Sequence, residues 1–86
     1  MIKRRQGWLA AQVGDELVMM SAETGSYIGL NSVGARVWEL IETPADVSQI
    51  CATLVGEFEV SDEDCRAEVE SFLAELEQRG AISRSP

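Results

Sequence analysis

Cysteines and carboxylates are the residues of this chain that are able to do chemistry. The sequence has two cysteines, fifteen acidic residues and no histidine. Without histidine, the chain lacks the usual general base near neutral pH and the commonest nitrogen ligand of metal ions. Cys51 and Cys65 follow neither CxxC spacing nor another metal-ligand pattern. We therefore expect two buried, free thiols that act as small hydrophobic residues, and no metal site.

The carboxylates are densest between residues 62 and 77, where Glu63, Glu70 and Glu77 recur beside Glu68 and Glu75 on one predicted helix. A charge run of this kind usually forms a solvated face rather than an acid-base pair. The sequence also lacks a glycine-rich phosphate loop, a serine nucleophile motif and an acidic metal-binding loop. These features predict no catalytic residues and no cofactors, so the protein is not expected to be an enzyme.

Length and charge narrow the remaining classes of function. Residues 1–86 are expected to form one domain, with its core between about residues 7 and 82. The formal net charge is -8, and residues 37–86 hold twelve acidic residues against three basic ones. Such a surface repels phosphate backbones, so no nucleic-acid partner is expected. Because no apolar run suits a signal peptide or a membrane span, we expect a cytoplasmic protein without a membrane partner.

Three strands are predicted to come before three helices. Residues 8–13 and 16–22 favour strands, and Gly14-Asp15 between them matches a two-residue hairpin turn. Residues 26–30 are short, aromatic and β-branched enough for a third strand. The sequence therefore predicts an α+β fold that begins with a three-stranded antiparallel sheet.

The first predicted helix is capped by Asn31 or Ser32 and stops at Thr43-Pro44. Gly34 lies inside it. Glycine at a helix interior costs about 1 kcal/mol relative to alanine, so the close approach of a neighbouring element is expected there.

The second predicted helix is the clearest, because apolar residues from 47 to 58 follow helical spacing without a gap. Its cap is either Thr43, with Pro44 at the first helical position, or Asp46, with the Gln49 side chain reaching back to the Asp46 backbone. The third helix is capped by Ser61 and ends at Gly80. Residues 83–86 are expected to be a loose tail.

The third strand is the part of the chain most suited to binding. An edge strand presents unpaired backbone groups to any extended peptide, and residues 26–30 carry no proline or charge that would prevent pairing. We expect the third helix to form a second wall. Its shoulder residue Leu73 is either partly exposed there or simply core. The predicted peptide-binding residues are Ser26, Tyr27, Ile28, Gly29, Leu30, Arg66, Val69, Glu70, Leu73 and Glu77.

A family resemblance supports this site. The chain resembles the pyrroloquinoline-quinone biosynthesis protein D family over residues 7–82, and no single motif carries the likeness alone. The segments that carry it are Gly25-Ser26-Tyr27-Ile28-Gly29-Leu30-Asn31, Val33-Gly34-Ala35, Trp38-Glu39-Leu40 and Phe72-Leu73 with Leu76. The resemblance implies a winged-helix-like recognition domain of ribosomally made, modified peptides. In such domains the leader of a precursor peptide adds antiparallel to the third strand, in the groove beside the third helix.

The pattern Tyr-x-x-Leu-Asn-x-x-Gly, which starts at Tyr27, is more similar to the stand-alone members of lasso-peptide systems than to those that serve pyrroloquinoline quinone. The implied partners are the precursor leader, a separate leader peptidase and a cyclase. We expect a monomer or weak dimer. The acidity of the third helix further predicts a leader with basic residues facing Glu70 or Glu77.

Three other functions remain open at this point. The first is a peptide chaperone of the pyrroloquinoline-quinone type or of another modified-peptide pathway. The second is a winged-helix DNA-binding regulator, although the third helix carries mostly acidic side chains where a recognition helix needs basic and amide ones. The third is a structural domain whose open strand edge pairs with a second copy.

Overall fold

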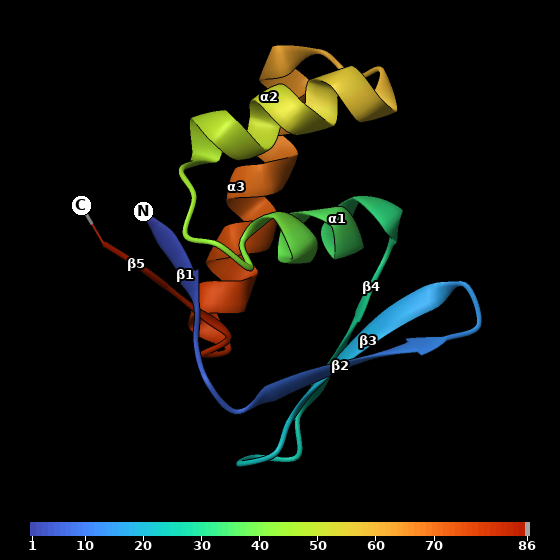
Figure 1. Ribbon diagram of the computed structural model, residues 1–86, viewed down its shortest axis with the longest axis vertical. Coiled ribbons are helices and arrows are strands. Elements are labelled where there is room, and N and C mark those ends of the chain that lie inside the picture. The colour runs from blue at the N-terminus through green and yellow to red at the C-terminus, as the bar shows by residue number, and fades with distance from the viewer. Residues whose placement is uncertain (86) are drawn as a thin grey trace.

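The computed structural model describes residues 1–85 and consists of a three-stranded sheet, three helices and a separate two-stranded ribbon (Figure 1). The elements in chain order are β1 (Ile2–Arg4), β2 (Trp8–Val13), β3 (Glu16–Ser21), β4 (Tyr27–Leu30), α1 (Ser32–Leu40), α2 (Val47–Phe58), α3 (Asp62–Gln78) and β5 (Ile82–Arg84). This order confirms the predicted α+β fold with an antiparallel sheet followed by three helices.

The sheet has the strand order β2-β3-β4, which leaves β4 at an edge. Val13 pairs with Glu16, so Gly14-Asp15 forms the hairpin turn predicted from the sequence, with Gly14 at a φ of 62°. One face of the sheet packs against the helices through buried residues such as Met19, Ile28 and Leu30. Figure 1 shows the helices gathered on that side of the sheet.

Each helix begins at a polar cap, which settles the alternatives left by the sequence. Asn31, rather than Ser32, caps α1, because its side chain accepts a hydrogen bond from the Gly34 backbone N–H at 2.8 Å. Asp46 precedes α2, and its backbone N–H donates to Gln49 Oε1 at 2.9 Å. Ser61 caps α3 by accepting from the Asp64 N–H at 3.2 Å.

The C-terminal end of α3 is closed by Gly80, as predicted. Its φ of 80° lets the Ala81 N–H donate to the Leu76 carbonyl at 2.8 Å, while the Gly80 N–H donates to Glu77 at 3.1 Å. Trp8 joins the sheet to this turn, since its indole N–H donates to the Gly80 carbonyl at 3.2 Å. The end of α3 is thereby held against the first strand of the sheet.

The loose tail predicted for residues 83–86 is wrong for the residues that the structure describes. β5 pairs antiparallel with β1, with Arg84 opposite Ile2 and Ile82 opposite Arg4. Ile2 and Ile82 are both buried, so burial of apolar area holds the ribbon on the core. The sequence pattern missed it because each strand has three residues and its partner lies at the other end of the chain. Residue 86 lies outside the described residues.

Charged side chains fix the first helix on two sides. Arg4 of β1 lies over the Trp38 ring, 4.3 Å from its centroid, and its guanidinium donates to the Trp38 carbonyl. Arg36 of α1 donates to both carboxylate oxygens of Glu57 in α2, at 2.9 Å each. These hydrogen bonds hold the pKa of Glu57 below its ordinary value. α1 is therefore fixed between the ribbon and α2.

Candidate functional site

The open edge of β4 presents two residues whose backbone groups face away from the sheet. The Ser21 N–H donates to the Ser26 carbonyl at 2.8 Å, and hydrogen-bonded pairs alternate along an antiparallel ladder. Ile28 and Leu30 therefore bond to β3. Tyr27 and Gly29 direct their N–H and C=O groups outward, where an added strand is able to pair with them.

The side chains of β4 alternate between the core and the solvent. Ile28 and Leu30 are buried, whereas Tyr27 is 71% exposed and Gly29 lies on the same outer face. Ser26, predicted as part of the edge, lies in the turn before β4. Its N–H donates to the Thr24 hydroxyl oxygen, and its own hydroxyl oxygen accepts a hydrogen bond from the Thr24 hydroxyl. The part of the predicted strand that is open for pairing is thus Tyr27–Leu30.

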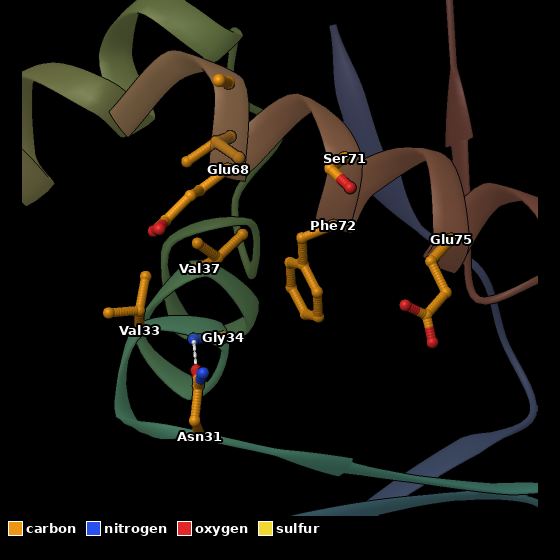
Figure 2. Close-up of a pocket in the computed structure, with 10 residues that line it drawn as sticks. Asn31, Val33, Gly34, Val37, Glu68, Ser71, Phe72 and Glu75 are labelled. Atoms are coloured by element: carbon orange, nitrogen blue, oxygen red, sulfur yellow. Dashed lines mark hydrogen bonds between the residues drawn. The ribbon is translucent and has the colours of Figure 1, made fainter. Parts of the chain in front are cut away.

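A groove of about 470 Å³ opens between α1 and α3, at the point where β4 ends. Figure 2 shows Phe72 and Glu75 projecting from α3 into the space above the strand that leads to Asn31. The residues that line it are Asn31, Val33, Gly34, Val37, Ala67, Glu68, Val69, Ser71, Phe72 and Glu75. Apolar and acidic side chains thus share one wall of the groove.

Gly34 explains how α1 and α3 come close enough to form the groove floor. A Cβ at Gly34 would lie 3.3 Å from the Phe72 ring and 3.4 Å from the Asn31 side-chain oxygen. This confirms the close neighbour predicted for the glycine inside α1, and identifies it as α3. The missing side chain leaves room for the aromatic ring that lines the groove.

The predicted residues of α3 lie mostly away from this groove. Val69 is the exception, because it lines the groove, although it is only 1% exposed. Leu73 is 0% exposed, so the core alternative for Leu73 is correct. Arg66 reaches Ser48 of α2, with Nη2 3.5 Å from the hydroxyl oxygen. Glu70 pairs with Arg84 of β5 at 3.1 Å. Glu77 is exposed and borders a shallow polar hollow near the end of α3.

The groove-facing side of α3 is the opposite shoulder of its apolar stripe. The residues there that face the groove are Glu68, Ser71, Phe72 and Glu75, and none of them is among the binding residues predicted from the sequence. The apolar spacing of α3 did include Phe72, but it could not show that Phe72 faces a groove, because Phe72 fits the core spacing as well as Leu73 does. Only the tertiary position of α1 shows which shoulder remains uncovered.

The groove has an acidic wall. Glu75 pairs with Arg79 one turn along α3 at 3.5 Å, and both side chains are about half exposed. Among the described residues, Glu68 makes no ion pair. A peptide that enters the groove therefore meets at least one carboxylate that lacks a partner within residues 1–85.

The two cysteines lie outside this site. Cys51 and Cys65 are free and buried, as predicted. Burial raises the pKa of the Cys65 thiol, and the neighbouring Cys51 adds to the shift. Within residues 1–85, no three histidine, cysteine or carboxylate side chains are grouped to hold a metal ion. No helix in the same range is long and apolar enough to cross a membrane.

The outer face of the sheet carries most of the large apolar side chains that remain exposed, and Met1 is exposed elsewhere. Leu9 lies opposite Met20, and Met20 lies opposite Tyr27, so one row crosses all three strands. Leu9 is 64% exposed and Met20 is 46% exposed, and Val13 on the same face is 60% exposed. This apolar sheet face ends at the open edge of β4.

Comparisons with known proteins agree with this architecture. The family model described as Coenzyme PQQ synthesis protein D (PqqD) matches residues 16–82. A solved structure described as TbiB1 in complex with the TbiA(beta) leader peptide is 26% identical, with a TM-score of 0.86 and coverage of 98% of each chain. No curated protein sequence matches the chain.

A second solved structure, described as lasso peptide synthetase B1 complexed with the leader peptide, has the same fold. It is 19% identical, with a TM-score of 0.85, and the match covers 96% of this chain and 98% of that chain. Together with the family model, these matches confirm the resemblance inferred from the strand and helix pattern.

Proposed function

This chain belongs to the PqqD family, and from that premise we propose that it binds the leader region of a ribosomally synthesised precursor peptide and presents it to separate modifying enzymes. The open edge of β4 is the observation that carries the proposal. The outward N–H and C=O groups of Tyr27 and Gly29 are suited to an antiparallel strand. The likeness to a protein solved with a leader peptide supports the same binding mode.

The groove beyond β4 supplies selectivity that backbone pairing alone lacks. A peptide strand along β4 would continue past Asn31 and reach the groove, where Phe72 offers an apolar contact. Glu68 and Glu75 favour a basic residue nearby. We assign this role to Glu68 and Glu75 instead of Glu70 and Glu77, because Glu68 and Glu75 line the groove. Glu70 lies outside it and pairs with Arg84, and Glu77 borders a different hollow.

The partner enzymes follow from the same family likeness. We assign the chain to a lasso-peptide pathway, in which a separate leader peptidase cuts the bound leader and a cyclase closes the ring. The chain itself acts as a non-catalytic adaptor, either as a monomer or as a weak dimer. The apolar sheet face supports peptidase docking, because it continues directly into the edge that holds the leader. Free buried thiols support a cytoplasmic setting.

The family description favours one alternative pathway, the synthesis of coenzyme PQQ. The leader-binding role is the same in both cases, and only the precursor differs. Titration with a lasso precursor leader and with a PQQ precursor leader separates the two, because the cognate leader binds more tightly.

Binding of a fluorescently labelled leader to wild type and two Gly29 variants tests the proposed function. Gly29→Pro removes one outward N–H and leaves the hydrogen bonds to β3 intact, so affinity is expected to fall roughly five- to tenfold. Gly29→Ala keeps the N–H and is the matched control for backbone pairing, and it is expected to lose less affinity than the proline variant. Melting curves check that both variants fold. Equal affinity of the proline variant, or no binding of any precursor leader, would contradict the proposal.

A further inference from the structure

Gly29 occupies a strand position that does not require glycine for its backbone. Its φ lies outside the left-handed region, and a Cβ would make only an ordinary contact. Glycine in a strand costs roughly 0.5–1 kcal/mol relative to alanine. A bare backbone on an open edge strand often marks a place where another chain approaches closely.

The carboxylate of Glu16, on β3, lies next to the position that a Gly29 side chain would occupy. Its Oε2 atom is 3.5 Å from the point that a Cβ of Gly29 would occupy. Val18 is opposite Gly29, so Glu16 is a diagonal neighbour on the same outer face. Glu16 is exposed, and within residues 1–85 it makes no ion pair. On the outer face of the sheet, a β4 position without a side chain therefore lies next to a carboxylate of β3 that makes no ion pair within residues 1–85.

We propose that Gly29 and Glu16 form a subsite for a lysine or arginine side chain of the bound peptide, at the position that pairs with Gly29. This inference rests on the proposed function and names the residue type that the strand selects. The Glu16 carboxylate repels an acidic side chain at this position of the peptide, so the subsite discriminates between side chains by the sign of their charge.

The geometry favours a long side chain. The Cβ of the residue opposite Gly29 in an added antiparallel strand would lie roughly 5 Å from the Gly29 position. The carboxylate lies beyond that, so the side chain must cross the glycine to reach it. Lysine and arginine do this with an apolar stem along the surface and a charged end at the carboxylate. The exposed ring of Tyr27, two residues away on the same face, provides apolar surface beside the stem.

An aromatic side chain would suit this position less well. It would cover the Glu16 carboxylate without supplying a hydrogen bond or an opposite charge, and loss of hydration then costs free energy. The net charge of -8 also favours a basic ligand at longer range.

Peptide selection with a charge reversal tests the subsite. A displayed library of random twelve-residue peptides is selected against wild type and against Glu16→Lys. Wild type is expected to enrich lysine or arginine at one fixed position, and Glu16→Lys to enrich aspartate or glutamate there. Glu23→Lys, in the turn between β3 and β4, makes the same change in net charge and is the matched control; it should retain the wild-type preference.

Affinity measurements then quantify the pair. Replacing the enriched basic residue by glutamine should weaken binding to wild type about two- to fivefold, the range of an exposed ion pair, and should leave Glu16→Gln binding unchanged. Amide exchange of Tyr27 and Gly29 is followed for each selected peptide. Peptides that protect these amides without any charge preference would overturn the subsite and leave the proposed function standing. Peptides that leave both amides unprotected would overturn the subsite and the proposed function together.

Discussion

Tyr27 and Gly29 carry the outward hydrogen-bonding groups of β4, and Phe72 carries the apolar surface of the neighbouring groove. Phe72 and Leu73 are adjacent on α3, but we expect Phe72 to contribute to binding and Leu73 to stability. Leu73 is fully buried, whereas Phe72 is partly buried and faces the groove. Substituting each in turn therefore separates stability from binding.

Leu73→Ala is expected to lower the free energy of unfolding by about 2–5 kcal/mol, because it leaves a cavity in the core. Phe72→Ala is expected to cost less stability and to weaken leader binding by about 1–2 kcal/mol. Denaturant unfolding and leader titration at a temperature where both variants are folded measure the two effects. A Phe72→Ala variant that binds normally would show that the leader does not use the groove.

Elements differ in how far their sequences reveal them. The periodic helices and the hairpin were predictable because their signals are local, as with Gly14-Asp15 and the caps Asn31 and Ser61. β1 and β5 were not predictable, since each has three residues and finds its partner across the whole chain. The wall of α3 that faces the groove was also missed, because an apolar stripe does not show which shoulder a distant helix leaves open.

We also predict that the apolar face of the sheet formed by β2, β3 and β4 is the docking surface of the peptidase. Leu9→Thr combined with Met20→Thr replaces two exposed apolar side chains by residues that suit strands. The double variant is expected to bind leader like wild type and to slow leader removal by the proposed partner peptidase several-fold. A peptidase assay with saturating leader measures this effect.

Ala52→Gln, on an exposed position of α2, is the matched control and should leave the peptidase rate unchanged. If the sheet variant supports the wild-type rate, the peptidase docks elsewhere on the adaptor. If it also loses leader affinity, then the face contacts the leader rather than the enzyme.

At the scale of the whole molecule, most of the negative charge and the open strand edge lie in different parts of the chain. Residues 37–86, which hold α2 and α3, carry most of the acidic residues, while the open strand edge belongs to the nearly neutral first third. The sequence thereby indicated the class of function and an open strand edge at β4. It did not predict the groove, because the groove exists only where α1 and α3 meet beyond the end of β4.

Amide hydrogen exchange of β4, with and without the precursor leader, tests strand addition most directly. In the free protein, the outward amides of Tyr27 and Gly29 should exchange quickly, and those of Ile28 and Leu30 more slowly because they bond to β3. Bound leader should slow exchange at Tyr27 and Gly29 and leave the alternate amides little changed. A bound leader that leaves Tyr27 and Gly29 exchanging as in the free protein would contradict strand addition at β4.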